Sequence, residues 1–600
     1  MDPQTLYQAL EAAADRFGAK PALHQPRSSG GARSVRTYSW NEYRQIAAEV
    51  ALGLRHYGIR KGDIVGLYSE TCAEFFLSDF GIFAGGSIAA AVYSSYTPSQ
   101  TLAALQRAEA KALFVEDPAT LRRLVAQDAD MIPKPCFLLT GAAEGAVPLE
   151  TLRSAGRQAL DADPEAIRRL QEEIDPEDPA ILYLTSGATG EPKMALVSHR
   201  ALLANLAMVP KVLDFGPEDR SLAFLPSAHM AQRLVVEILP VAMGMQTWFV
   251  ESLMRLPQEI REVRPTFFLA PPRLWERIHS TVCVEVNKRG KLGRNVFYAA
   301  LGLGLKAAEL RQGDRPVPLW MRSGLRLADR LVYRKIRERL GGKMRLAISG
   351  AAPLGRGLAL FYEAVGVPLV EGYGLTEGGV VILNPLKRPK AGTIGVPLPD
   401  VEVKLGDDGE LLIHSDTLFT GYWRDPQATA GVLRDGWLHT GDLATIDEQG
   451  YISITGRKKE VLVLSTGKKV YPAFVESLVM MDPIFSSVFL AGDRLPYVTA
   501  LLTVNPAAVE SVKGLERLRG RSMAEIVAAP PLLEEVKKAI GRVNSQLADW
   551  ERIRRYHLLD REFSAEQGEL TPTMKLRRSR VLQNHRDLIA RLYAGKEESH

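Results

Sequence analysis

Between about residues 40 and 350 of this 600-residue chain, short apolar runs alternate with helical patterns. Nine of these runs are six or seven residues long and rich in β-branched and aromatic residues: "IVGLYS", "AAAVYS", "ALFVED", "CFLLTG", "AILYLTS", "RSLAFLP", "QTWFVE", "TFFLAPP" and "RLAISG". Strands that alternate with helices pair in parallel and pack in βαβ layers. The sequence therefore predicts an α/β fold with a large N-terminal domain.

The pattern changes twice further along the chain. Between about residues 395 and 455, "VEVKLGDDGELLIHS" and "LATIDEQGYISITG" predict short strands joined by tight turns, which form a small antiparallel β subdomain. After the charged "GRKKE" at 456–460 the composition shifts to a compact α+β unit that occupies the last 140 residues. The "GRKK" segment is therefore a candidate linker between two domains.

Composition restricts the class of protein. Hydrophobic residues make up 46% of the chain and charged residues 24%, which is ordinary for a globular protein. Cys72, Cys136 and Cys283 are far apart, so neither a disulfide framework nor a cysteine zinc site is predicted, and a reducing compartment such as the cytoplasm is expected. The most apolar stretch, 75–93, contains Asp79 and several glycines, which indicates a core helix and strand rather than a membrane span.

The net charge of +5 is unevenly distributed. The segment 287–345 holds 16 Lys and Arg against 4 Asp and Glu, a local net charge of +12, so the rest of the chain carries −7. Its apolar residues follow a helical spacing, and a basic amphipathic segment can lie on an anionic membrane surface. The alternative is a helix pair packed on the body with a solvated basic face. Nucleic acid is not expected as a partner, because no binding motif accompanies the charge.

A loop rich in small residues follows the strand predicted at 181–184. "YLTSGATGEPKMALVSH" spans 183–199 and places two glycines and several hydroxyl side chains before Lys193. Backbone N–H groups, hydroxyls and an ammonium in such a loop can hold a phosphate. The order of Gly187, Gly190 and Lys193 differs from that of a Walker A loop, and a mobile surface loop remains the alternative.

Three other motifs place reactive residue types in turns. In "TGDLATIDEQGYISITGR", a hairpin around Gln449-Gly450 brings Asp442 opposite Gly456-Arg457, and a carboxylate can accept from both hydroxyls of a ribose. "VEGYGLTEGG" offers Tyr373 for stacking on a purine and Glu377 as an oxygen ligand for Mg²⁺. "LTPTMKLRRSR" carries Lys575. Taken singly, these motifs also fit an ion pair, an exposed turn and a solvated charge run.

Taken together, the motifs carry a resemblance. "LTSGATGEPKMALVSH", "SGAAPL", "GYGLTE", "WLHTGD", "GRKKEVLVLSTGKKVYP" and "TPTMKLRR" follow one another as in adenylate-forming enzymes, the superfamily of acyl-CoA synthetases, luciferases and peptide-synthetase adenylation domains. "LPSAHMAQR" at 225–233, "RPTFFLAPPRLWERI" at 264–278 and the basic insert resemble long-chain fatty acyl-CoA synthetases in particular. The resemblance covers nearly the whole chain.

The resemblance implies a reaction and a set of roles. A fatty acid would be activated with ATP and Mg²⁺ to acyl-AMP and passed to coenzyme A, with release of pyrophosphate and AMP. The implied ATP and AMP site comprises Thr185, Ser186, Gly187, Thr189, Gly190, Lys193, Gly350, Tyr373, Gly374, Thr376, Asp442, Arg457 and Lys575. Catalytic roles are implied for Lys575, Glu377, Thr185, Lys193 and His229, and Mg²⁺ binding for Thr185 and Glu377.

The resemblance also implies a division of the chain. An N-terminal adenylation domain would span 1–456, a hinge 457–460 and a mobile C-terminal domain 461–600. Rotation about Lys459 in the hinge would bring Ser465, Gly467 and Lys468 to coenzyme A for the second step.

Two positions depart from the family pattern. Ala188 stands where Ser or Thr is usual, and Met194 where Gly is usual after the lysine. Both put the detailed phosphate geometry in question rather than the reaction.

Three other functions remain open at this point. A fatty acyl-AMP ligase would hand the acyl group to a carrier protein, although "GRKKEVLVLSTGKKVYP" lacks the insertion of those ligases. A catalytically inactive nucleotide binder would have no need of Lys575. A scaffold would dock at the inner face of the membrane through 287–345. Acyl chain length and oligomeric state do not follow from the sequence.

Overall fold

The computed structural model describes residues 3–29, 32–185, 193–510, 512, 514–571 and 575–594. All nine apolar runs contain strands, which confirms the predicted α/β class. They are β3 (Ile64–Tyr68), β4 (Ile88–Val92), β5 (Ala112–Val115), β6 (Cys136–Leu138), β8 (Pro179–Thr185), β10 (Arg220–Ala223), β11 (Gln246–Phe249), β12 (Phe267–Ala270) and β13 (Leu346–Ser349).

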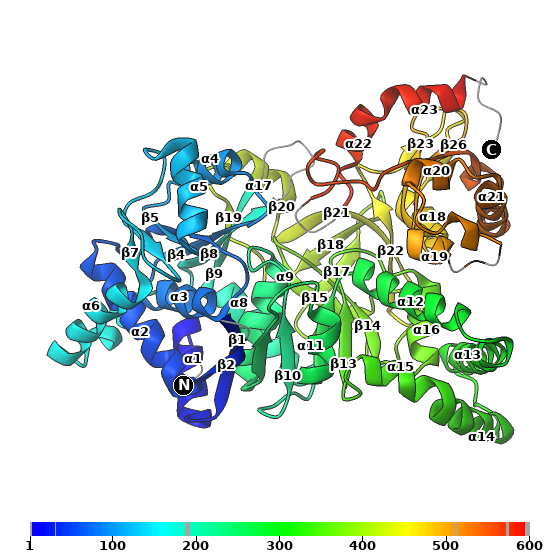
Figure 1. Ribbon diagram of the computed structural model, residues 1–600. Coiled ribbons are helices and arrows are strands. Elements are labelled where there is room, and N and C mark those ends of the chain that lie inside the picture. The colour runs from blue at the N-terminus through cyan, green and yellow to red at the C-terminus, as the bar shows by residue number, and fades with distance from the viewer. Residues whose placement is uncertain are drawn as a thin grey trace.

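An eight-stranded sheet forms the first part of the N-terminal domain, in the order β19-β9-β8-β4-β3-β5-β6-β7 (Figure 1). Its strands not yet listed are β7 (Val147–Pro148), β9 (Lys193–Ser198) and β19 (Gly421–Tyr422). Both faces of this sheet are covered. Val65 and Leu67 pack into one hydrophobic core, whereas Ile64 and Tyr68 pack into another. A strand that is buried on both faces is apolar throughout, which explains the unbroken runs in the sequence. The helices around it are α1 (Leu6–Phe17), α2 (Trp40–His56), α3 (Ala73–Ala84), α4 (Pro98–Arg107), α5 (Pro118–Asp128), α6 (Leu149–Ala162), α7 (Ala166–Glu172) and α8 (His199–Val212).

Two further sheets complete the α/β part. One has the order β10-β11-β1-β2 and the other the order β12-β13-β14-β15-β16. The antiparallel hairpin of β1 (Pro21–Ser29) and β2 (Ala32–Ser39) lies before the region in which the sequence shows its alternation, and was not predicted. Strands β14 (Leu369–Leu375) and β15 (Gly379–Leu383) form a second hairpin, and β16 (Val396–Pro397) follows.

Asp79 explains how a charge can lie within the most apolar stretch of the chain. Helix α3 buries it fully, and both of its oxygens accept from the guanidinium of Arg233, with Nε 2.7 Å from Oδ2. Arg233 begins a π-helix, η1 (Arg233–Ile238), and is also fully buried. A buried charge needs such a partner, so the stretch 75–93 forms a core helix and strand as predicted.

The antiparallel subdomain predicted for 395–455 is present. It contains β17 (Glu402–Leu405), β18 (Glu410–His414), β20 (Leu433–Arg434), β21 (Trp437–Ile446) and β22 (Ile452–Arg457). One strand of this region behaves differently: β19 (Gly421–Tyr422) leaves the subdomain and pairs with β9 (Lys193–Ser198) at the edge of the large sheet. The subdomain and the large sheet are therefore connected next to the glycine-rich loop.

The residues after 460 have a hydrophobic core of their own, which includes Val475, Leu490, Leu502 and Val536. It is built from α18 (Pro472–Val479), β25 (Phe485–Ala491), β26 (Val498–Val504), α21 (Pro530–Asn544) and β27 (Ile553–Leu558). In Figure 1 this C-terminal domain lies above the end of the N-terminal domain that is farthest from α1, and the segment before α22 (Arg578–Asn584) reaches back to the centre.

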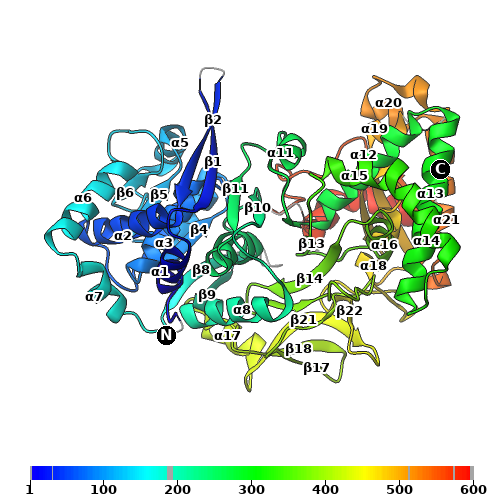
Figure 2. The same cartoon turned by 90° about the horizontal axis from the view of Figure 1, so that it is seen from below.

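The basic segment forms helices, as its apolar spacing predicts. Helix α12 (Pro272–Asn287) leads to α13 (Lys291–Gln312) and α14 (Leu319–Ala328), and α14 continues through the π-helix η2 (Asp329–Tyr333) into α15 (Arg334–Arg339). Figures 1 and 2 both place α13 and α14 at the outer edge of the molecule. Within the described part of the chain, none of the helices combines the length and the apolar character needed to cross a bilayer.

Candidate active site

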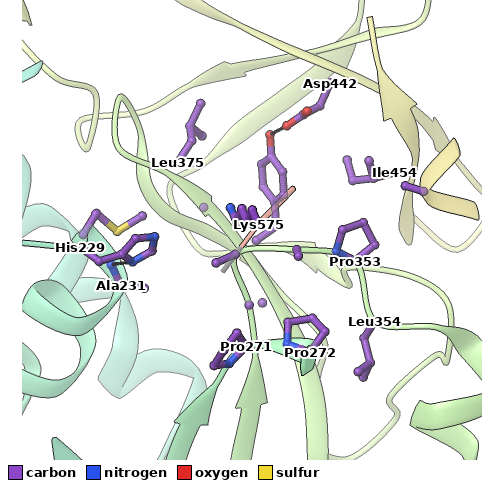
Figure 3. A pocket seen from close by; sticks show the side chains of 18 of the residues that line it. His229, Ala231, Pro271, Pro272, Pro353, Leu354, Leu375, Asp442, Ile454 and Lys575 are labelled. Atoms are coloured by element: carbon purple, nitrogen blue, oxygen red, sulfur yellow. Dashed lines mark hydrogen bonds between the residues drawn. The ribbon is translucent and has the colours of Figure 1, made fainter. Parts of the chain in front are cut away.

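A cavity of about 2550 Å³ lies between the two domains. Its walls come from the ends of β8 and β13, from β14, β21 and β22, and from the segment that contains Lys575. Figure 3 shows His229, Asp442 and Lys575 around this space. Residues that are far apart in sequence therefore meet at one site.

The hairpin of β21 and β22 places a carboxylate on the cavity wall. Asp442 lies opposite Arg457 in the register, as predicted from the sequence, and Oδ1 accepts from Arg457 Nε at 3.0 Å. Its other oxygen, Oδ2, accepts from the hydroxyl of Tyr373 at 2.6 Å. Two donors thus hold the Asp442 side chain, which is 5% exposed, in one orientation. The hydrogen bond also fixes the ring of Tyr373 on strand β14.

The two ends of the glycine-rich loop are held together by strands. Thr185 ends β8 and pairs with Lys193 at the start of β9, and the Thr185 hydroxyl donates to the carbonyl of Lys193 at 3.1 Å. Ser186, Gly187, Thr189 and Gly190, proposed from the sequence to contact phosphates, lie outside the described residues, as does Ala188. Both described ends, Thr185 and Lys193, line the cavity.

Met194 has a structural explanation. It pairs with Leu184 in the β8–β9 hairpin and is buried in the core on one face of the large sheet, with 4% exposure. Its side chain therefore packs in the protein interior, away from the cavity. The departure from glycine at this position concerns packing.

Tyr422 is a site residue that the sequence reasoning missed. Its hydroxyl donates to Oε1 of Glu377 at 2.6 Å, and the ammonium of Lys193 lies over its ring, 4.5 Å from the centroid. Tyr422 reaches this place because β19 pairs with β9. The isolated "GY" in the sequence gives no sign of this strand, since a two-residue strand has no recognisable periodicity.

Glu377 and Thr185 suit the role of Mg²⁺ ligands. Mg²⁺ is usually held by one or two oxygen ligands of the protein together with phosphates. Tyr422 engages only one carboxylate oxygen of Glu377, and the Thr185 hydroxyl uses its proton toward Lys193, which leaves its lone pairs available. The donor set that these residues offer is therefore compatible with a cation shared with phosphates.

Three glycine and threonine positions named from the sequence also reach the cavity. Gly350 follows β13, Gly374 lies near the end of β14, and Thr376 lies in the β14–β15 turn. A Cβ atom on Gly374 would lie 2.4 Å from the carbonyl oxygen of Gly379, so the tight pairing of this hairpin requires glycine there. The "SGAAPL" segment contributes Pro353 and Leu354 to the wall (Figure 3).

His229 and Lys575 approach the cavity from different domains. The N–H of Ala231 donates to Nδ1 of His229 at 3.2 Å, so Nδ1 is the acceptor and Nε2 carries the proton. Burial and, to a smaller extent, the charge of Lys575 lower the pKa of His229 to about 3, so the ring is neutral at physiological pH. His229 can donate one hydrogen bond from Nε2 without carrying charge.

The Lys575 side chain is exposed to the cavity, whose walls enclose it. This enclosure, followed by the charge of Arg457, lowers the pKa of Lys575 to about 8. The segment is shaped by two hydrogen bonds: Thr571 N–H donates to the carbonyl of Lys575 at 2.7 Å, and Lys575 N–H donates to the hydroxyl of Thr571 at 3.0 Å. Lys575 is therefore a cation at neutral pH that can lose its charge in mild alkali.

Glu371 is a second residue that the sequence reasoning missed. It lies on β14 two residues before Tyr373, lines the cavity, and accepts from the N–H of Leu354 at 2.8 Å. Burial raises the pKa of Glu371 to about 8, so the carboxyl group is neutral at physiological pH. It anchors the "SGAAPL" wall to the sheet without adding a negative charge to the cavity.

The residues expected at the hinge and at coenzyme A differ in whether they line the cavity. Lys459 lies in the turn after β22 and lines the cavity. Ser465, Gly467 and Lys468 belong to a turn between β23 (Leu462–Val463) and β24 (Lys469–Val470) and do not line it. Lys468 instead lies over the ring of Trp550, 4.9 Å from the centroid.

Comparison with known proteins identifies the family. Residues 10–423 match the AMP-binding enzyme family, and residues 459–597 match the AMP-binding enzyme C-terminal domain. The chain therefore belongs to the AMP-binding family, whose members are adenylate-forming enzymes, and the resemblance inferred from the motifs is confirmed.

Relatives of known name extend over most of the chain. The long-chain-fatty-acid–CoA ligase FadD15 of Mycobacterium tuberculosis is 35% identical over 557 residues, which are 92% of this chain and 91% of that protein. The long-chain-fatty-acid–CoA ligase ACSBG2 of Rattus norvegicus is 26% identical over 637 residues, covering 99% and 93%.

Solved structures share the fold. The anthranilate CoA ligase AuaEII in complex with anthranoyl-AMP superposes with a TM-score of 0.73 at 20% identity, covering 98% of both chains. The Mycobacterium tuberculosis fatty acyl CoA synthetase gives a TM-score of 0.60 at 20% identity, covering 98% and 99%. The large α/β domain, the antiparallel subdomain and the small C-terminal domain are thus a known arrangement.

Proposed function

We propose that this enzyme activates a long-chain fatty acid with ATP to acyl-AMP and transfers the acyl group to coenzyme A, releasing pyrophosphate and AMP. The observation that carries the proposal is the convergence of Lys575, neutral His229 and the Asp442–Arg457–Tyr373 group on one cavity. The name of the FadD15 relative supports the choice of substrate.

In the first step, a carboxylate oxygen of the acid attacks the α-phosphorus of ATP. The bond from that phosphorus to the bridging oxygen breaks, and pyrophosphate leaves with the bonding electrons. Two anions approach one another, so catalysis consists mainly of positioning and charge neutralisation. The Lys575 ammonium, which lines the cavity, would contact both the carboxylate and the α-phosphate, and His229 Nε2 would donate to the carboxylate.

The nucleotide would be held by residues on the N-terminal side. The carboxylate of Asp442, fixed by Arg457 and Tyr373, suits the ribose hydroxyls. Lys193 and the Thr185 hydroxyl suit the outer phosphates. Mg²⁺, held by Glu377 and Thr185, would neutralise charge on those phosphates.

Part of the cavity is lined by apolar side chains and suits a long acyl chain. Its walls come from α8, η1 and the segments after β10 and β11, and the side chains are large and aliphatic or aromatic: Leu206, Val209, Leu213, Phe224, Leu234, Val235 and Leu256. Burial of methylene groups contributes about 0.8 kcal/mol each, so a chain of a dozen or more carbons gains far more from this wall than acetate does.

In the second step, the sulfur of coenzyme A attacks the carbonyl carbon of acyl-AMP, the thiol proton passes to solvent, and AMP leaves. Gly467 and its neighbours lie outside the cavity in the present arrangement. A rotation of the C-terminal domain about the hinge at 457–460 would exchange the Lys575 segment for the Gly467 turn.

The test is AMP and pyrophosphate release by the purified protein with ATP and Mg²⁺, across acids from two to about twenty carbons, with and without coenzyme A. We expect AMP release that requires both coenzyme A and a long acid. Pyrophosphate release that depends on the acid but not on coenzyme A would instead indicate an acyl-AMP ligase that serves a carrier protein.

A further inference from the structure

Exposed apolar side chains are concentrated on the basic helices. Among the described residues, seven of the nineteen exposed large apolar side chains lie between residues 292 and 331. Trp320 is 69% exposed, Leu327 60% and Leu331 47%. Single exposed apolar residues are ordinary, but a cluster of this kind marks an interaction surface.

Three of these residues share one face of a helix. Trp320, Leu327 and Leu331 are spaced by seven and four residues along α14 and η2, which places them on the same side. The side packed on the protein is formed by other residues, including Met321, Ala328 and Val332, all buried. This stretch therefore has two apolar sides, and only one of them is used within the chain.

Arginines accompany the exposed apolar residues. Arg326, Arg330 and Arg334 follow at intervals of four and lie beside the stripe. Arg334 pairs with Glu338 at 2.9 Å, whereas no ion pair is found for Arg326 or Arg330 within the described part of the chain. We call the surface formed by Trp320, Leu327, Leu331 and these three arginines the α14 face.

The helix that carries this face is firmly attached. Helix α14 approaches α13 closely at Gly324, where a Cβ atom would lie 2.9 Å from Cδ2 of Leu303. Both views place the pair at the periphery of the molecule, and no described residue of either helix lines the cavity. A flat surface can therefore contact the α14 face without covering the active site.

We propose that the α14 face binds a membrane surface rich in anionic phospholipids. A lipid interface accommodates both components: Trp320, Leu327 and Leu331 enter the boundary between headgroups and acyl chains, while Arg326 and Arg330 bind the phosphates. The local net charge of +12 over 287–345 adds a long-range attraction to an anionic leaflet. Nucleic acid would use the charge but leave the apolar residues in water.

Co-sedimentation with vesicles tests the proposal, without ATP, acid or coenzyme A, so the outcome is independent of the enzymatic reaction. The full chain should bind vesicles of phosphatidylcholine with phosphatidylglycerol, bind phosphatidylcholine alone weakly, and dissociate as salt is raised. Leu327→Glu should lower the vesicle affinity by about tenfold or more, because a charge replaces an apolar contact at the interface.

Val125→Glu is the matched control. Val125 is 48% exposed on helix α5, so the substitution introduces the same charge at a similar helical position outside the α14 face. Equal losses for Leu327→Glu and Val125→Glu, or no binding by the unmodified protein, would overturn the proposal. A dimer in vesicle-free solution that Leu327→Glu dissociates would also overturn it, by showing that the face joins two copies of the chain.

Discussion

The C-terminal domain carries two turns with opposite placements. The first, closed by the bridge between Leu570 and Leu576, carries Lys575 into the cavity. The second, with Gly467 at a φ of 78°, lies outside the cavity. One domain cannot present both turns to the same site in one orientation. We therefore propose that the two half-reactions use two orientations of the domain, and that the orientation seen here is the one suited to adenylation.

Lys575→Ala gives the largest expected effect. Loss of the Lys575 ammonium from the cavity should slow acyl-AMP formation by about 10²–10³-fold, because developing charge loses a positioned partner. Thioester formation from pre-made acyl-AMP should stay near normal. The two rates are measured separately in single-turnover experiments. If thioester formation failed while adenylation was spared, the assignment of the two turns would be reversed.

Gly467→Ala should slow thioester formation and spare adenylation, with a smaller effect than that of Lys575→Ala. No atom lies within 4 Å of the position that a Cβ would take in the present arrangement, so adenylation should be unaffected. Thioester formation should fall by roughly 10–100-fold, because a small displacement of coenzyme A from its reactive position lowers the rate by about that factor.

The control for this variant is Gly520→Ala, in the same domain. Gly520 has a φ of 72° and equally open surroundings, so it carries the same backbone cost of alanine in the left-handed region. Equal effects of the two substitutions on thioester formation would mean that Gly467 matters for stability alone.

At pH 9 adenylation, which uses the Lys575 turn, should be slowed by up to about tenfold, whereas thioester formation, which uses the Gly467 turn, should not be slowed in this way. Because the pKa of Lys575 is lowered to about 8, its charge is present below that pH and lost above it. kcat/KM for adenylation should therefore fall as pH rises through 8, whereas thioester formation should not show this loss. In Lys575→Arg the fall should move to higher pH, since a guanidinium stays charged. A fall unchanged by Lys575→Arg would assign the titration to another group.

The smallest expected effect concerns the contact between the domains. Asn505 Nδ2 donates to the hydroxyl of Ser280 at 3.1 Å, which joins α19 (Pro506–Val509) to α12. Ser280→Ala should weaken the present orientation and lower the adenylation rate by a few-fold at most, as one hydrogen bond contributes about 1 kcal/mol. Thr281→Ala, at the neighbouring position, is the control: its hydroxyl donates within α12, to the carbonyl of Arg277. Equal rates in both variants would show that this contact does not select the orientation.

Local sequence patterns accounted for most of the fold. Unbroken apolar runs marked the buried strands, and the Gln449-Gly450 turn was enough to place Asp442 opposite Arg457. The hairpin at 21–39 was not predicted because its strands are rich in polar residues and include Pro26, which is unfavourable within a strand. The two-residue strand β19 was not predicted because it pairs with a distant strand and is too short to show a periodicity.

The site was predicted less completely. Motifs named Tyr373, Glu377, Asp442 and Lys575, and the structure brings all four to one cavity. Tyr422 and Glu371 were missed because their contacts, to Glu377 and to the amide of Leu354, appear only once the chain is folded. The tautomer of His229 likewise follows from one backbone N–H that the sequence cannot place.

The pairing of β19 with β9 limits how the chain can be divided. The composition changes near residue 395, which suggests a boundary at which to truncate the protein. Such a truncation would remove β19 and leave β9 as an open edge of the eight-stranded sheet. Unpaired edges recruit strands from other molecules, so a fragment that ends there should aggregate rather than behave as an independent domain. A compositional boundary is therefore no safe place to cut this protein.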